Sequence, residues 1–76
     1  MIKAYIFIIV KPGGRVNVSP EALMKIKGIK DVTEVSGEYD IVLRVDLHEL
    51  PELNVLIKNV RLLGGIEKTT TMISAE

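Results

Sequence analysis

The sequence predicts a single α+β domain, and three observations support that class. Four segments are rich in the β-branched and aromatic residues that favour strands, and two others repeat apolar residues at spacings typical of amphipathic helices. Each helical segment begins at a Pro-Glu pair and ends at glycine. With 76 residues, the chain has room for one hydrophobic core, so residues 1–76 are expected to form one domain.

The first strand is expected from Lys3 to Val10, because its residues are apolar on both parities. That pattern is typical of a strand covered on both faces, which places it centrally in a sheet. A Lys-Pro-Gly-Gly sequence ends the strand, and a polar loop leads to Ser19, whose hydroxyl is suited to cap a helix opened by Pro20. Gly28 is expected to end this helix after roughly two turns, as a left-handed C-terminal residue.

The middle of the chain predicts a hairpin. Residues Ile29 to Ser36 form a half-exposed strand whose broken alternation indicates a bulge or an edge position. Gly37 supplies the turn, since glycine accepts the positive φ that a tight connection needs. Tyr39 to Leu47 then alternates apolar and polar residues, with Tyr39 on the same apolar face as Ile41. One face of this third strand is therefore expected to join the core.

The second helix is expected to start at Pro51 and to end at Gly64-Gly65, and Ile66 to Ser74 forms the fourth strand. The apolar positions of this helix recur every three or four residues: Leu53, Leu56, Ile57, Val60 and Leu63. A weak internal repeat relates the two halves, because each contains a Pro-Glu pair followed by a Gly-Ile pair. Two right-handed strand-helix-strand units interleave as an antiparallel sheet in the order 4-1-3-2 with both helices on one face. This arrangement is the ferredoxin-like β-α-β-β-α-β plait.

Composition limits the partners of this domain. Ten basic residues balance ten acidic ones, and no basic stripe with interleaved aromatics appears, so direct nucleic-acid binding is not expected. The N-terminal apolar run is too short to span a bilayer and lacks a cleavage pattern, so no membrane association is expected and the location is predicted to be cytoplasmic. The chain has no cysteine, which excludes disulfides and a Cys/His zinc site as sources of stability.

Oligomerisation is the remaining common way to stabilise so short a chain. Both helices of the plait cover one face of the sheet, yet the first strand is apolar on the other face as well. We therefore expect a second copy to cover that face through a two-fold axis, giving a homodimer.

Asp40 is the first candidate for a functional side chain. Its parity differs from that of Ile41, which points it away from the helix-covered core, and a carboxylate held at the root of a strand would anchor an ammonium group. Alternatively, Asp40 accepts hydrogen bonds from its own turn. Gly37 also has two interpretations, because its backbone N–H would suit a ligand carboxylate and glycine also serves the turn alone.

Four further side chains are weaker candidates. Thr69 and Thr71 share one face of the fourth strand and offer hydroxyls to a polar ligand, although threonine is also simply a favoured strand residue. Tyr39 and Tyr5 would each close one side of a pocket, or would serve as core or interface aromatics with a phenol at the rim.

No arrangement of residues indicates an enzyme. The chain shows no nucleophile beside a base, no glycine-rich phosphate loop and no cluster of metal ligands, so neither a cofactor nor a metal is expected. His48 is the natural acid or base near neutral pH, although a solvated loop histidine is the simpler interpretation. Two alternatives to a binding module remain. One is a cofactor-free enzyme of the dimeric α+β-barrel type with His48 or Tyr5 in a cavity under the sheet, and the other is a purely structural assembly module.

The loop motif Gly37-Glu38-Tyr39-Asp40, followed by Ile41-Val42-Leu43-Arg44-Val45, resembles the effector-binding domain of the Lrp/AsnC transcriptional regulators, which is also called the RAM domain. The likeness extends to Gly28-Ile29-Lys30-Asp31-Val32 and to Leu63-Gly64-Gly65-Ile66-Glu67-Lys68-Thr69, so it covers almost the whole chain. Each motif is short, but their order and spacing together make the resemblance fairly specific.

The resemblance implies a ferredoxin-like domain that dimerises through its sheet and assembles into a ring such as an octamer or decamer. Free amino acids or similar small effectors would bind between dimers. The matching positions are Gly37, Tyr39 and Asp40 in the loop motif, with Thr69 and Thr71 on the last strand. The family's regulators carry an N-terminal helix-turn-helix, whereas this chain begins at the first strand, so the resemblance implies a stand-alone domain that senses amino acids or co-assembles with a full-length Lrp/AsnC regulator.

Overall fold

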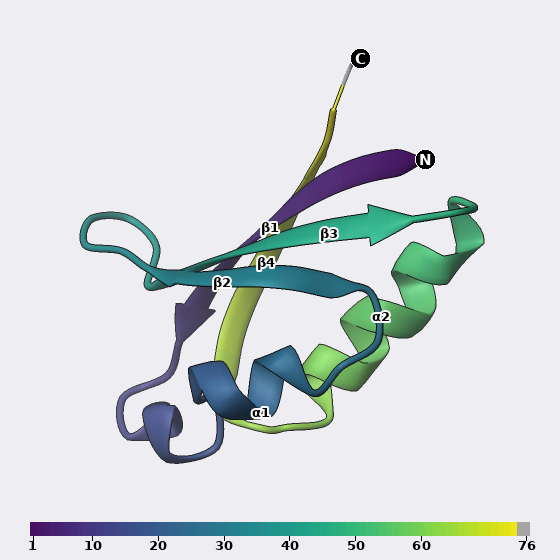
Figure 1. Cartoon of the computed structure of the whole chain (residues 1–76). Helices are drawn as coiled ribbons and strands as arrows, with labels where there is room; N and C mark the ends of the chain where they lie inside the picture. The colour runs from purple at the N-terminus through teal and green to yellow at the C-terminus, as the bar shows by residue number, and fades with distance from the viewer. Residues whose placement is uncertain (75–76) are drawn as a thin grey trace.

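The computed structural model describes residues 1–74 and confirms the predicted fold class. The elements are β1 (Ile2–Val10), a 3-10 helix (Gly14–Val16), α1 (Pro20–Met24), β2 (Ile29–Glu34), β3 (Ile41–Leu47), α2 (Pro51–Arg61) and β4 (Ile66–Ile73). The sheet order β2-β3-β1-β4 is the predicted order 4-1-3-2 read from the other edge, and all neighbouring strands are antiparallel. Both α1 and α2 lie on the same side of the sheet (Figure 1). Ala75 and Glu76, which belong to the predicted domain, lie outside the described residues.

β1 is the centre of the core. It lies between β3 and β4, so that Ile6 is opposite Leu43 on one side and Thr71 on the other. Alternate residues of β1 and β3 face the helices and have no exposed surface: Ala4, Ile6, Ile8, Ile41, Leu43 and Val45. The helices complete this core with Leu23 of α1 and Leu53, Leu56 and Val60 of α2. Within residues 1–74, none of the helices has both the length and the apolar character needed to cross a membrane.

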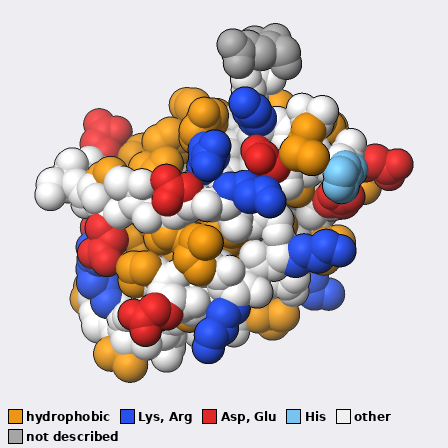
Figure 2. Space-filling model, viewed as in Figure 1, with side chains coloured by type: hydrophobic (Ala, Val, Ile, Leu, Met, Phe, Trp, Pro, Cys, Tyr) orange, Lys and Arg blue, Asp and Glu red, His pale blue; other side chains and the backbone are white. Residues whose placement is uncertain are grey.

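The opposite face of the sheet carries the other parity of the same strands, and we call it the open face. It includes Tyr5, Phe7, Ile9, Val42, Arg44, Asp46, Thr70 and Met72, with Lys3 opposite Asp46 and Lys68 opposite Ile9. In the single chain, 39% of Tyr5 and 59% of Met72 are exposed. Figure 2 shows hydrophobic side chains gathered at the upper left, on the side away from the helices, with charged side chains closer to the N-terminus. Two kinds of surface therefore share this face, one apolar and one of mixed charge.

α1 is shorter than predicted. It ends at Met24 instead of continuing to Gly28. The Ile26 N–H donates to the carbonyl of Leu23 at 3.0 Å, which closes a turn between residues three apart instead of the four of an α-helix. The predicted cap is confirmed, since the Ser19 hydroxyl accepts a hydrogen bond from Ala22 N–H at 3.1 Å. Gly28 has the expected positive φ of 100°, but it lies in the turn that follows the helix.

The hairpin strands are also shorter than predicted at their shared end. β2 ends at Glu34 rather than Ser36, and β3 begins at Ile41 rather than Tyr39. The Val35 N–H donates to the carbonyl of Asp40 at 2.9 Å, so residues 36–39 form the loop. The expected irregularity of β2 is confirmed, because its register against β3 shifts at residues 29–31 and β2 is an edge strand.

The loop after β1 contains a 3-10 helix that the sequence did not predict. Its first residue, Gly14, packs directly on the backbone of Gly65 at the start of β4, where a Cβ on Gly14 would lie 2.9 Å from the Gly65 Cα. Lys11 N–H also donates to the carbonyl of Gly65 at 2.8 Å. These contacts hold the 3-10 helix against the end of the sheet and determine where its next residue, Arg15, lies.

Candidate functional site

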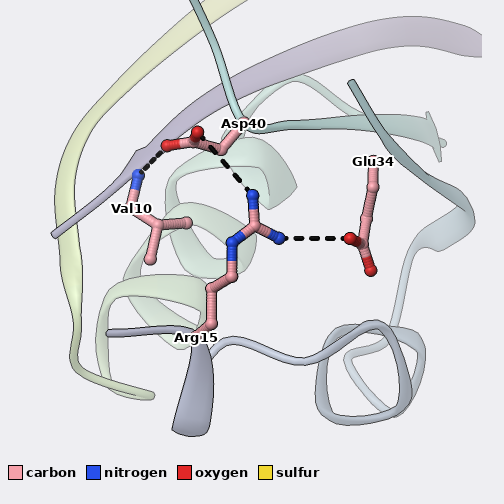
Figure 3. A network of polar contacts seen from close by, with 4 residues as sticks. All are labelled: Val10, Arg15, Glu34 and Asp40. Atoms are coloured by element: carbon pink, nitrogen blue, oxygen red, sulfur yellow. Dashed lines mark hydrogen bonds and ion pairs between the residues drawn. The ribbon is translucent and has the colours of Figure 1, made fainter. Parts of the chain in front are cut away.

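Asp40 lies where the hairpin loop meets the end of β1. Its backbone N–H donates to the carbonyl of Ile8 at 2.9 Å, and its Oδ2 accepts the N–H of Val10 at 2.7 Å (Figure 3). The register of β1 against β4 shifts at this point, between Ile9 and Val10. The Asp40 carboxylate thus takes the place of a strand carbonyl at the end of β1, and the hydrogen bond from Val10 fixes the position of the carboxylate.

The bond from Val10 contradicts one of the two interpretations of the sequence, in which the Asp40 side chain accepts hydrogen bonds from its own turn. The N–H that Asp40 binds lies thirty positions earlier in the chain, not in its own turn. The turn uses only the Asp40 carbonyl, through Val35. The second carboxylate oxygen, Oδ1, faces the guanidinium of Arg15 at 3.7 Å. Asp40 is therefore both a structural acceptor for β1 and one side of an ion pair.

Arg15 connects two carboxylates. Its NH1 donates to Glu34 Oε2 at 3.1 Å, and its NH2 lies 3.7 Å from Asp40 Oδ1, as Figure 3 shows. The side chains of Arg15 and Glu34 are about half exposed, whereas that of Asp40 is 35% exposed. A guanidinium half exposed to water is held weakly by such pairs, since surface ion pairs contribute roughly 0–1 kcal/mol. Arg15 thus lies between two carboxylates but is free to exchange partners.

A hollow opens beside these groups. It has a volume of about 420 Å³ and is lined by Val10, Lys11, Pro12, Gly13, Arg15, Val16 and Asp40. Apolar side chains and charged groups of both signs therefore meet at one small surface. Sequence reasoning found only Asp40 here, because Arg15 and Glu34 carry no periodic or motif signal and meet only through the fold.

Tyr39 does not lie on the helix-covered face, so its predicted orientation was wrong. β3 starts two residues later, which releases Tyr39 from the alternation of the strand. Its ring instead packs against Phe7 of the open face, with centroids 5.3 Å apart and planes at 53°. The loop residue Gly37 has a φ of 133°, and a Cβ there would meet nothing within 4 Å. Gly37 thus meets the requirement of the turn and leaves open space beside its backbone.

Thr69 and Thr71 share one face of β4 as expected, but that face is the helix-covered one. They lie opposite Ile8 and Ile6, respectively. The Thr69 hydroxyl accepts a hydrogen bond from Arg61 of α2 at 3.0 Å. β1 separates both threonines from β3, a distance of about 9–10 Å between strands, so the single chain does not bring them together with Asp40.

His48 lies at the opposite end of β3 from Asp40. It is exposed, and its backbone N–H donates to Glu52 Oε1 at 3.1 Å. A second hollow of about 390 Å³ borders this region, and its lining includes His48, Asp46, Lys27 and Glu52. Tyr5 is on the open face and does not line that hollow, so the two residues considered for an enzyme are separated.

Known proteins resemble this chain over different parts of their length. The homocitrate synthase of Sulfurisphaera tokodaii is 41% identical over 51 residues, which is 67% of this chain but only 11% of the synthase. The protein TTHA0845 from Thermus thermophilus has a similar structure with a TM-score of 0.86 and 32% identity, covering 100% of this chain and 95% of that one.

A feast or famine regulatory protein from M. tuberculosis, complexed with L-methionine, has a TM-score of 0.84 over 100% of this chain and 51% of its own. At 21% identity, that likeness establishes the fold alone. The Lrp/AsnC ligand binding domain matches residues 3–76, nearly the full sequence. The motifs around Asp40, the plait and this match agree, and the chain belongs to the Lrp/AsnC ligand-binding domain family.

Proposed function

We propose that this protein is an effector-binding and oligomerisation module that binds an amino acid or a similar small molecule around Asp40. The observation that carries the proposal is the Asp40 carboxylate, which the Val10 N–H holds at the edge of a mixed polar and apolar hollow. A carboxylate fixed in this way is ready to accept an ammonium group without reorganising. The L-methionine bound by the M. tuberculosis regulator supports the same ligand class.

The remaining site residues are proposed to act across a subunit boundary. Gly37 and Tyr39 lie in the loop beside Asp40, whereas Thr69 and Thr71 of the same chain lie across β1. A neighbouring protomer would bring its threonines to the loop, so that a bound effector contacts two subunits. Ligand occupancy would then be coupled to assembly, because each stabilises the other.

The open face is proposed to be the first interface, covered by a second copy. Its apolar members would pack about a two-fold axis, as expected of an isologous dimer. Asp46 supports this interface, because its Oδ1 is buried and has no hydrogen-bond partner among the described residues. A buried acceptor of this kind requires a donor, and a partner's sheet would supply one. Dimers would then form a ring such as an octamer or decamer, alone or with a full-length Lrp/AsnC regulator.

The domain is proposed to regulate rather than to catalyse. The matched part of homocitrate synthase is 11% of that enzyme, a length suited to an appended domain. The cofactor-free enzyme considered from the sequence needs His48 or Tyr5 in a cavity beneath the sheet. His48 is exposed beyond the end of β3, and a filled interface between two open faces would leave Tyr5 no such cavity. A structural assembly module without ligand is the alternative that the first experiment addresses.

The first experiment is thermal unfolding of the purified protein with each amino acid at millimolar concentration. A ligand at one hundred times its Kd stabilises the folded state by about 2.7 kcal/mol, and about 1 kcal/mol raises the midpoint of a small domain by roughly 4–8 °C. Selective stabilisation is expected. An identical midpoint and an identical oligomer with every amino acid would support the assembly module instead.

Asp40→Asn tests the anchor. The amide oxygen still accepts a hydrogen bond from Val10, but the negative charge is lost, so the selective shift is expected to disappear. Asp31→Asn is the matched control, because Asp31 is an exposed aspartate that also accepts a backbone N–H, from Val32 at 3.0 Å. If Asp40→Asn kept the ligand response of the wild type, the effector site would have to lie elsewhere.

A further inference from the structure

We propose that Arg15 binds the carboxylate of the effector and that, in the empty site, its guanidinium occupies the place of the effector's ammonium. This inference rests on the proposed function and assigns a role to a residue that the sequence motif does not include. It also explains why a cation lies between Glu34 and Asp40 at the site where a cation is to be bound.

The two contacts of Arg15 are unequal. The bond to Glu34 Oε2 has ordinary hydrogen-bond length at 3.1 Å, whereas the 3.7 Å separation from Asp40 Oδ1 is an ion pair without a hydrogen bond. Asp40 is therefore held firmly by Val10 and only loosely by Arg15. An ammonium that approached Oδ1 at hydrogen-bond distance would replace the weaker of these two contacts.

The displaced guanidinium has a partner in the same ligand. An amino acid carries its carboxylate one carbon from its ammonium, and the planar fork of arginine binds carboxylates through two parallel hydrogen bonds. Arg15 is long and half exposed, so it turns from Asp40 to the ligand at little cost. One residue thus closes the empty site and completes the occupied one.

Charge balance around the hollow favours a zwitterion. Arg15 and Lys11 are positive, Asp40 lines the hollow with them, and Glu34 holds the guanidinium, so the four formal charges sum to zero. A zwitterion preserves this balance, whereas a simple amine leaves an excess positive charge beside a displaced Arg15. Val10, Pro12 and Val16 provide apolar surface for the side chain of the ligand.

The consequence is a selectivity that depends on one side chain. In the wild type, an amino acid gives the displaced Arg15 a carboxylate partner, whereas its decarboxylated amine leaves Arg15 as an excess positive charge beside the bound ammonium. In Arg15→Gln, the amino acid loses its carboxylate partner, while the amine finds Asp40 and Glu34 already free. Affinity for the amino acid is expected to fall roughly ten- to hundredfold, as for loss of a charged hydrogen bond, and affinity for the amine is expected to rise.

Calorimetric titration of the whole chain tests this with three pairs of probes: L-leucine and 3-methylbutylamine, L-lysine and 1,5-diaminopentane, and L-methionine and 3-(methylthio)propan-1-amine. Wild type, Arg15→Gln and Arg15→Lys are compared, with Lys25→Gln as a control that removes an exposed positive charge outside the hollow. Arg15→Lys keeps the charge without the fork and is expected to have intermediate affinity for the amino acid.

The expected result is that the preference for amino acid over amine collapses at least tenfold in Arg15→Gln and is unchanged in Lys25→Gln. If both members of a pair lost affinity equally in Arg15→Gln, Arg15 would be merely structural and the inference would be wrong, while amino acid binding itself would stand. If no amino acid bound the wild type, either in these pairs or in the thermal unfolding series, both the inference and the proposed effector class would be overturned.

Discussion

On the face of the sheet that α1 and α2 cover, the side chains of Ile6, Ile41 and Leu43 have no exposed surface, whereas Tyr5 and Met72 on the open face are 39% and 59% exposed. The two faces alternate along the same strands, so their chemistry comes from the same local sequence. Only the first is completed by the chain itself. The helix-covered face therefore specifies the fold, while the open face and the loop beside it are available for partners and ligands.

The largest expected effect comes from truncating neighbouring residues that point to opposite faces. Leu43→Ala removes a fully buried side chain from the helix-covered face and is expected to lower the free energy of unfolding by about 2–5 kcal/mol. Val42→Ala changes the adjacent, half-buried residue of the open face and should cost less in the dissociated chain. Urea unfolding at several protein concentrations measures both. Equal losses at the lowest concentration would mean that the faces are equally complete in one chain.

A charge placed on the open face tests association of the protomers rather than folding of the single chain. Met72→Glu adds a carboxylate to a residue that is 59% exposed in the single chain, so the protomer should fold normally. Burying that carboxylate in a dimer is costly, and association is expected to weaken at least hundredfold, or about 2.7 kcal/mol. Sedimentation velocity over a range of concentrations measures the change. Glu67→Gln, on an exposed residue at the start of β4, is the control, and undisturbed assembly of Met72→Glu would place the interface elsewhere.

Weakening the hydrogen bond from Val10 to Asp40 is expected to have a smaller effect on stability, because this bond lies at the end of the sheet and involves neither face. Asp40→Asn keeps an acceptor for this N–H but replaces a charged hydrogen bond by a neutral one, so a loss of about 1 kcal/mol is expected without ligand. The Asp31 carboxylate accepts a hydrogen bond only from the next residue, Val32, so the free energy of unfolding of Asp31→Asn should remain within about 0.5 kcal/mol of the wild-type value. Thermal unfolding compares the two. A larger loss in Asp31→Asn would contradict the assigned role of Asp40.

The two faces also explain what the sequence could and could not predict. The apolar pattern of β1 and the alternation of β3 are local, so they predicted the element order and, through the handedness of strand-helix-strand units, the sheet order. The position of Arg15 between Glu34 and Asp40 depends on the Gly14–Gly65 packing, which joins residues about fifty positions apart and leaves no periodic signal. The predicted orientation of Tyr39 was wrong for a related reason. The alternation of β3 does not extend to Tyr39, because β3 begins at Ile41, and loop geometry and the Phe7 ring decide how the Tyr39 side chain lies.

Thr71 gives the smallest expected effect, because it lies on the helix-covered face yet is proposed to serve a site on another protomer. Thr71→Val keeps the shape and the strand preference of the side chain and removes only its hydroxyl. If that hydroxyl meets an effector across the boundary, its loss is worth one neutral hydrogen bond, about 0.5–1.5 kcal/mol, or up to roughly tenfold in affinity.

Thr70→Val is the matched control for this last change, since Thr70 lies opposite Phe7 on the open face, where the dimer interface is proposed. Titration with the amino acid that gives the largest thermal shift should therefore show weaker binding for Thr71→Val alone, and altered association for Thr70→Val alone. The reverse result would exchange the roles of the two faces. β4 would then present its helix-covered residues to the dimer and its open-face residues to the ligand. The full burial of Ile6 and Ile8 opposes this exchange, because the helices already occupy the centre of that face and leave only its β4 edge, where Thr71 is half-buried, within reach of another protomer.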